Sequence, residues 1–156
     1  MNLFVVRHGD SPFTTATDHQ RPLSDLGIRQ ATQSGRFIAT RIPASKSLIV
    51  CSDALRTTTT AHTIGEQLNS VEIKAQANLY GAQTGQWCDV MERHADIDNL
   101  ILVGHNPTMS LLARHLFSLR AFQFQPACVA HFGLEIDADG LRLPAQYKEF
   151  FNPDAS

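Results

Sequence analysis

The sequence predicts an α/β fold, and two observations carry this prediction. Three short apolar segments, residues 2–6, 47–51 and 99–103, lack polar alternation, which is typical of strands covered on both faces of a parallel sheet. Segments with apolar residues at helical spacing separate them. Because crossovers between parallel strands are right-handed, this alternation places helices on both faces. The predicted architecture is a three-layer α/β/α sandwich with a mostly parallel central sheet.

Helices and one further strand are expected between these segments. The first helix is predicted over residues 25–42, where apolar residues recur at helical spacing and Ser24 is placed to cap the start. The same spacing predicts helices over residues 53–68 and 84–95, and a short apolar run predicts a strand over residues 71–75.

The C-terminal part adds a helix and a hairpin. Pro107 stands where the first turn of a helix tolerates proline, so a fourth helix is predicted to begin there. Residues 132–136 alternate as in a strand, and an Asp-Gly pair offers a hairpin turn to residues 141–143. From Pro144 onward no periodicity is evident, and the aromatic residues of this tail are expected to pack back onto the domain.

Composition limits the possible partners. The chain has 156 residues, of which 43% are hydrophobic and 18% charged, so we expect a single domain over residues 1–156 with a full hydrophobic core. The net charge is −2 and no basic stripe occurs, so nucleic acid is not expected as a partner.

Membrane and redox signals are also missing from the sequence. No apolar run approaches the ~18 residues of a membrane-spanning helix, and no basic segment precedes a long apolar one as in a secretory signal. We therefore expect a cytoplasmic protein without a membrane partner. Three widely spaced cysteines without a C-x-x-C pair favour reduced core residues over disulfides or a zinc site, and they are Cys51, Cys88 and Cys128.

Arginine or histidine side chains occur at or shortly after the ends of three predicted strands. Arg7-His8-Gly9 ends the first, Ser52 to Arg56 follows the second, and Gly104-His105-Asn106-Pro107 follows the third. Ligand sites in such sheets lie at the carboxyl ends of the strands, so these segments are expected to converge. Two arginines, two histidines and the adjacent helix N-termini would then form a pocket suited to a phosphoryl group.

Each segment alone has a structural explanation. An Arg or His after a strand is commonly a solvated loop residue, and Gly and Asn-Pro suit any tight turn. Only the combination of all three strand ends favours a site. The remaining histidines have no neighbouring ligand pattern and are interpreted as structural or surface residues, namely His19, His62, His94, His115 and His131.

These motifs resemble the histidine phosphatase superfamily, which includes the phosphoglycerate mutases. The segment Arg-Pro-Leu-Ser-Asp-Leu-Gly at residues 21–27 is similar, more narrowly, to small bacterial phosphohistidine phosphatases of the SixA type. The resemblance covers the chain to about residue 136. In the middle motif, which usually reads Ser-Pro-x-x-Arg-Ala-x-Gln-Thr-Ala, Asp53, Thr57 and Thr59 replace the Pro, Ala and Gln, whereas Arg56 is kept.

The resemblance implies roles for the strand-end residues. His8 would be the phosphoryl acceptor, and Arg7, Arg56 and His105 would bind the phosphoryl oxygens. Possible further site residues are Gly9, Asp10, Arg21 and Ser52. No cofactor or metal is implied, because the cationic side chains would supply the positive charge. A zinc site on the two histidines is the alternative, but the sequence near them offers no third ligand.

The substrate class is suggested by two features of the family that this sequence lacks, a general acid and a lid. Many members have a carboxylate that protonates the leaving alkoxide, but residues 79–83 read Leu-Tyr-Gly-Ala-Gln, and Asp89 and Glu92 on the next predicted helix do not align with that acid. A protonated phosphohistidine expels neutral imidazole and needs no such acid. Only one strand and one helix are predicted between residues 68 and 99, so no lid subdomain is expected.

Three functions remain open from the sequence. The leading hypothesis is a metal-independent phosphohistidine phosphatase that acts on a signalling or phosphotransfer protein through a phosphorylated His8. The second is a small-molecule phosphomonoesterase that uses the same nucleophile. The third is a phosphate-binding module without catalysis, which the altered middle motif would allow.

Overall fold

Twelve helices and strands form the part of the chain that the computed structural model describes, residues 1–43 and 46–153. In chain order they are β1 Asn2–Arg7, η1 Asp18–Gln20, α1 Asp25–Ala39, β2 Ser47–Ser52, α2 Leu55–Glu66, β3 Glu72–Gln76, η2 Ala77–Leu79, α3 Thr84–Arg93, β4 Asn99–Gly104, α4 Thr108–Leu116, β5 Val129–Asp137 and β6 Gly140–Phe151. None of the described helices is long and apolar enough to cross a membrane.

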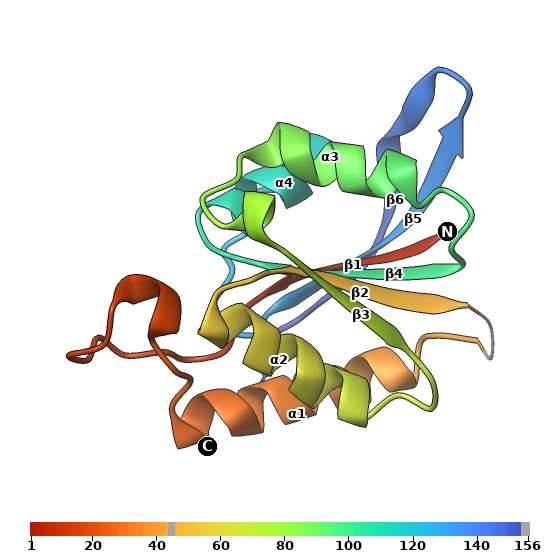
Figure 1. The fold of residues 1–156 in the computed structure, drawn as a ribbon. Coiled ribbons are helices and arrows are strands. Elements are labelled where there is room, and N and C mark those ends of the chain that lie inside the picture. Colours follow the sequence, from red (N-terminus) through yellow and green to blue (C-terminus); the bar gives the residue numbers. More distant parts are fainter. Residues whose placement is uncertain (44–45, 154–156) are drawn as a thin grey trace.

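A mixed six-stranded sheet with the order β3-β2-β4-β1-β5-β6 forms the middle layer. The strands β3, β2, β4 and β1 are parallel, and β5 and β6 continue the sheet in antiparallel fashion. Helices α1 and α2 cover one face, and α3 and α4 cover the other (Figure 1). The predicted three-layer α/β/α sandwich with a mostly parallel sheet is therefore confirmed.

The core lies on both faces of the central strands, as their uninterrupted apolar runs predict. Successive side chains of a strand point to opposite faces. In β1, Leu3 and Val5 belong to one buried cluster, which also contains Trp87 and Leu112 from α3 and α4. Phe4 and Val6 belong to the other, with residues of α1 and α2. Each strand is therefore held between two helical layers, which fixes the level at which it ends.

The tail from Pro144 differs from the prediction, because it is not irregular but continues β6 as far as Phe151. Two irregularities in the pairing of β5 with β6 shift the register, and they break the alternation that would otherwise show a strand in the sequence. Pro144 is tolerated because β6 is an edge strand. The tail aromatics do pack onto the domain, in a cluster of Phe122, Phe124, Tyr147 and Phe150 that is called the aromatic cluster below.

Smaller differences concern helix ends and one cysteine. The first helix ends at Ala39 rather than at residue 42, and the second begins at Leu55 rather than at residue 53. Pro107 precedes α4 as its N-cap residue instead of lying in the first turn. All three cysteines are free, but only two are buried, since Cys88 is partly exposed on α3.

The loop after β1 packs against the start of α1 through two glycines. A Cβ atom on Gly9 would lie 2.5 Å from the Gly27 carbonyl oxygen, and a Cβ atom on Gly27 would lie 2.3 Å from the Asp10 carbonyl oxygen. Both separations are far below van der Waals contact, and backbone cannot yield as a flexible side chain can. The two glycines therefore set how closely the loop that follows His8 approaches the helix.

Gly27→Ala is expected to lower the free energy of unfolding by roughly 1–3 kcal/mol, the usual cost of forcing extra atoms into a packed site. Gly85→Ala in α3 is the matched control, since a Cβ atom there would meet nothing within 4 Å. The control should be neutral or stabilising by up to about 1 kcal/mol, because alanine is the better helix former. Urea denaturation of both variants measures the difference, and equal stabilities would contradict this account of the Gly9–Gly27 contact.

Candidate active site

The register of the parallel strands brings the three predicted segments to one edge of the sheet. Arg7 at the end of β1 is paired with Gly104 at the end of β4. Cys51 of β2 is paired with the residue before Gly104, so Ser52 stands at the same level. The His8 backbone N–H donates to the Gly104 carbonyl over 3.1 Å. The predicted convergence of the strand ends is therefore present in the structure.

His8 is held as a neutral ring with one nitrogen free. Its Nδ1 lies 2.7 Å from the Gly9 carbonyl oxygen, and the residue is only 7% exposed. A carbonyl oxygen can only accept a hydrogen bond, so Nδ1 carries the proton and Nε2 keeps its lone pair. Burial, together with the positive charges nearby, lowers the pKa of His8 to about 3. The ring is thus neutral at neutral pH, with a lone pair on Nε2.

His105 lies beside His8, with the two ring centroids 5.5 Å apart. Its Nε2 is 2.6 Å from the Ser52 hydroxyl, which in turn is 2.7 Å from the Thr57 hydroxyl. Burial lowers the pKa of His105 to about 4. Ser52, a possible site residue from the sequence, therefore sets the orientation of the His105 ring, and Thr57 of the altered middle motif supports Ser52.

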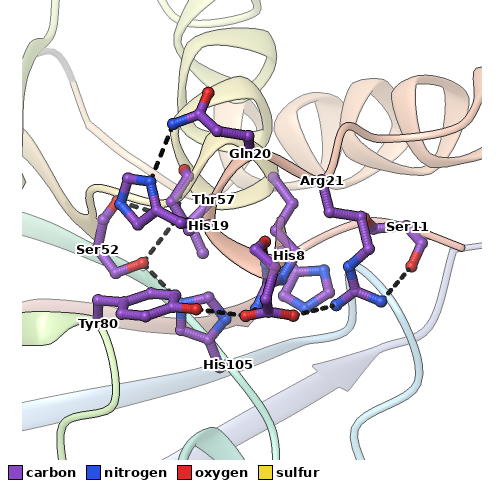
Figure 2. A network of polar contacts seen from close by, with 12 residues as sticks. His8, Ser11, His19, Gln20, Arg21, Ser52, Thr57, Tyr80 and His105 are labelled. Carbon is purple, nitrogen blue, oxygen red and sulfur yellow. Dashed lines mark hydrogen bonds and ion pairs between the residues drawn. The ribbon is translucent and has the colours of Figure 1, made fainter. Parts of the chain in front are cut away.

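Three arginine side chains are anchored by backbone carbonyls around the two histidines. Arg7 Nη1 donates to the Phe124 carbonyl over 2.8 Å, and Asn106 donates to the same oxygen over 3.3 Å. Arg56 Nη1 donates to the Asp18 carbonyl over 2.6 Å. Arg21 Nη1 donates to the Ser11 carbonyl over 3.0 Å, and Figure 2 shows its guanidinium pointing toward His8. In each arginine, a hydrogen bond from the terminal Nη1 atom thus fixes the guanidinium group.

The inner nitrogens of this group have no protein partner among the described residues. They are the Nε atoms of Arg7, Arg21 and Arg56 and Nδ1 of His105. Buried nitrogens of this kind normally have a hydrogen-bond partner, so several of them in one place call for a ligand rich in acceptors. The three arginines are always protonated, which makes that ligand an anion. Phosphoryl oxygens fit both requirements.

Asp18, which the sequence analysis did not single out, lies among these cations. Its carboxylate accepts hydrogen bonds from the Tyr80 hydroxyl and from Arg56 Nη2, the latter over 3.1 Å. The Arg21 guanidinium is 3.6 Å away. The Tyr80 hydrogen bond and then Arg56 lower the pKa of Asp18. No motif marks Asp18. Its position three residues before Arg21, in the segment after the first strand, indicates that it lies near the site.

His19 is interpreted from the sequence as a structural or surface residue, and its contacts in the structure join two segments of the fold. Its Nε2 lies 2.9 Å from the carboxylate of Asp53, and its ring packs on Tyr80 with centroids 5.0 Å apart. Asp53 is one of the residues that depart from the family motif, where proline is usual. The altered motif therefore gains an ion pair that joins η1 to the start of α2, and Arg56 keeps its place in the pocket.

Gly9 and Asp10 connect the loop after β1 to α2 and α1, and the Gly9 carbonyl also holds His8. The Gly9 N–H donates to the Thr60 hydroxyl over 3.0 Å. The Asp10 carboxylate accepts from the Ser24 hydroxyl over 2.6 Å, and Ser24 caps α1 as predicted. Asp10 thus ties the loop to α1. Glu92 lies far from the site, against Gly140 in the β5–β6 hairpin.

Metal-binding potential was searched over residues 1–43 and 46–153. No group of three or more His, Cys, Asp or Glu side chains suited to a metal ion occurs within these ranges.

His131, one of the histidines assigned no role, is buried and stacks on Phe4 with centroids 4.2 Å apart.

The lowered pKa values predict unusual titration of the two site histidines. The rings of His8 and His105 are expected to stay neutral from pH 8 down to about pH 5, whereas a histidine in a model peptide titrates near 6.5. Between these values the unfolded chain binds more protons than the folded protein, so the free energy of unfolding should fall as pH drops below about 6.5. An NMR titration of the ring nitrogens measures this, and midpoints near 6.5 for both rings would contradict it.

A neutral histidine beside anchored arginines, at the carboxyl edge of a parallel sheet, is an arrangement suited to phosphoryl transfer. The chain belongs to the histidine phosphatase superfamily (branch 1), whose family model matches residues 3–96. It is therefore a phosphatase. A relative named phosphohistidine phosphatase SixA homolog, from Haemophilus influenzae, is 26% identical over 142 residues, which cover 83% of this chain and 86% of the relative.

Two solved structures share the fold. The protein histidine phosphatase SixA, solved in complex with tungstate, has a TM-score of 0.81 at 19% identity and covers 98% of this chain and 97% of its own. A mycobacterial glucosyl-3-phosphoglycerate phosphatase has a TM-score of 0.65 at 17% identity and covers 95% of this chain and 99% of its own. The fold is thus common to phosphatases named for protein and for small-molecule substrates.

Proposed function

We propose that the protein is a metal-independent phosphohistidine phosphatase that acts on a histidine-phosphorylated signalling or phosphotransfer protein. One observation carries the proposal. The Gly9 carbonyl holds the proton of His8 on Nδ1, which leaves Nε2 unprotonated in a site where four buried nitrogens have no partner among residues 1–43 and 46–153. The same surroundings suit an in-line attack on phosphorus followed by hydrolysis of a phosphorylated His8.

In the first step, the His8 Nε2 lone pair forms a bond to phosphorus while the bond to the leaving group breaks. The Nε groups of Arg7, Arg21 and Arg56 donate to the phosphoryl oxygens as their charge redistributes. If the Ser52 hydroxyl donates to His105 Nε2, the His105 proton resides on Nδ1 and becomes a further donor to the phosphoryl group. Arginine and histidine thus supply the positive charge of the pocket.

In the second step, water attacks phosphorus and the bond to His8 Nε2 breaks. The electron pair returns to Nε2, and both water protons leave with the product as dihydrogen phosphate. The Gly9 carbonyl keeps the Nδ1 proton in place throughout, so His8 departs as a neutral imidazole. Imidazole is a good leaving group, since its conjugate acid has a pKa of about 6.5.

The substrate class is inferred from the surroundings of the pocket. No carboxylate occurs over residues 79–83, where many family members have a general acid, so alcohol leaving groups are disfavoured. Between α2 and β4 the chain forms only β3, η2 and α3. A pocket without additional covering elements accepts a side chain presented on a folded protein, whereas a small metabolite gains from enclosure.

The test compares three substrates on one preparation. These are a phosphotransfer domain phosphorylated on histidine with phosphoramidate, p-nitrophenyl phosphate and a sugar phosphate. We expect the highest kcat/KM for the phosphohistidine domain, slow turnover of the aryl phosphate, and no change on adding EDTA. A sugar phosphate hydrolysed fastest would favour the small-molecule phosphomonoesterase, and phosphate binding without any turnover would favour the binding module.

A further inference from the structure

The Asp18 carboxylate has acceptor capacity that the protein does not use. Its Oδ2 atom accepts from Tyr80 and from Arg56 Nη2, which fills that oxygen. Its Oδ1 atom has only the 3.6 Å contact with Arg21 among the described residues. A carboxylate oxygen accepts about two hydrogen bonds, and the Asp18 side chain is 53% exposed. Oδ1 is therefore open to a donor that arrives from solvent.

This open oxygen belongs to a carboxylate that contacts three residues of the site, Tyr80, Arg56 and Arg21. Tyr80 and Arg21, which contact the Asp18 carboxylate from two sides, lie on either side of His8 and point toward each other (Figure 2). The Tyr80 ring packs on His105 with centroids 5.7 Å apart, and His105 packs on His8. The Asp18 carboxylate is thus connected to His8 through Tyr80 and His105, and its charge acts on the His105 ring.

The charge of Asp18 is also fixed. The hydrogen bond from Tyr80 and the charge of Arg56 lower its pKa, so the group is a carboxylate at neutral pH and not an acid. Conversely, Asp18 raises the pKa of Tyr80, which keeps the phenol protonated as a donor. Asp18 is therefore suited to accept a proton-bearing group and unsuited to protonate an alkoxide.

We propose that Asp18 determines substrate specificity by accepting a hydrogen bond from the unphosphorylated ring nitrogen of the substrate phosphohistidine. This inference rests on the proposed function and names the residue that recognises the leaving group. The Gly9 carbonyl holds the N–H of His8, and Asp18 Oδ1 holds the corresponding N–H of the substrate. The two imidazoles between which the phosphoryl group moves thus have one acceptor each.

The transfer balances without a proton donor. The His8 Nε2 lone pair forms the new P–N bond, and the substrate P–N bond breaks with its electron pair going to the substrate nitrogen. The substrate ring already carries a proton on its other nitrogen, held by Asp18, so it leaves as neutral imidazole. Without Asp18 that proton would be lost more readily and the substrate would have to leave as an imidazolate.

The same carboxylate discriminates against phosphate monoesters. A sugar phosphate offers no ring N–H at this position and brings an alkoxide, whose developing negative charge Asp18 repels. An aryl phosphate also lacks the donor, but its leaving group is stable as an anion, so its rate depends less on Asp18. The ratio of kcat/KM for phosphohistidine to that for p-nitrophenyl phosphate therefore reports the contribution of Asp18.

The experiment is Asp18→Asn, which keeps an oxygen for Tyr80 and Arg56 but removes the charge. We expect kcat/KM for the phosphorylated phosphotransfer domain to fall roughly ten- to a hundredfold, the worth of one hydrogen bond to a charged group. We expect kcat/KM for p-nitrophenyl phosphate to fall less, so the ratio of kcat/KM for phosphohistidine to that for p-nitrophenyl phosphate should fall roughly tenfold. Tyr80→Phe is the matched control, because it removes a donor to Asp18 and keeps the carboxylate.

The pH profile separates recognition from positioning. In the wild type, Asp18 holds the bound substrate imidazole protonated, so the alkaline limb of kcat on phosphohistidine should move to lower pH in Asp18→Asn. Equal losses on both substrates and an unmoved limb would overturn the inference, because Asp18 would then only position Arg56. If the wild type fails to hydrolyse phosphohistidine, the proposed function itself is overturned.

Discussion

His8→Ala is expected to reduce turnover at least ~10⁴-fold on every phosphorylated substrate, because the loss of a covalent nucleophile removes the whole two-step route. The substitution leaves the strand β1 and the Gly9–Gly27 contact unchanged, so the variant should fold. Mixing the wild type with a ³²P-labelled substrate and quenching in alkali should trap a label that is lost in acid, as expected for a P–N bond. The variant should take up no label.

His62→Ala provides the control for this experiment. His62 is an exposed histidine on α2 and makes no contact with the pocket residues described above. Its variant should label and turn over as the wild type does. Label that persists in His8→Ala would show that another residue accepts the phosphoryl group. The free Nε2 of His8 would then not be the nucleophile.

Arg56→Ala is expected to lower kcat roughly 10²–10³-fold, the range for removing one preorganised donor to developing charge. The effect should be large because Arg56 is only 6% exposed and its Nε atom has no protein partner among the described residues. Arg56→Lys should restore only part of the rate. A lysine ammonium is a point charge and cannot bind Asp18 with its outer nitrogens while donating to phosphate with an inner one.

Arg29→Ala on the exposed face of α1 is the control for net charge, since it removes one positive charge from the surface. It should retain kcat within about twofold, because exposed charges are screened by salt. A near-normal rate for Arg56→Ala would mean that the altered middle motif no longer serves catalysis. That result would favour the reading in which the pocket binds phosphate by other residues.

The strand ends were predictable because their signal is local. Each of the three apolar segments in the sequence is followed within five residues by Arg or His, and parallel strands of similar length end at one edge. The strand β6 was not predictable, because its pairing with β5 contains register shifts and one proline, which remove the period of two. The predicted helix boundaries differ from the observed ones by a few residues, because apolar residues at helical spacing continue beyond the last hydrogen-bonded turn.

The rim of the site shows the limit of motif reasoning. Asp18 and Tyr80 are 62 residues apart and come from two short 3-10 segments or their ends, which have no periodicity to detect. The pair His19–Asp53 was hidden for another reason. The motif comparison shows only that Asp53 stands where proline is usual. It does not show that the new carboxylate contacts His19.

The carbonyl of Phe124, to which Arg7 and Asn106 both donate, links the pocket to the far edge of the sheet. Phe124 is held in place by the aromatic cluster, and half of that cluster comes from β6. The motif residues named from the sequence resemblance all lie before residue 136, and β6 begins only at Gly140. A polypeptide that stopped there would contain every motif residue and lack the strand that secures the anchor of Arg7. The strand β6 therefore supports the site without contributing a motif residue, and the site needs more of the chain than the motifs span.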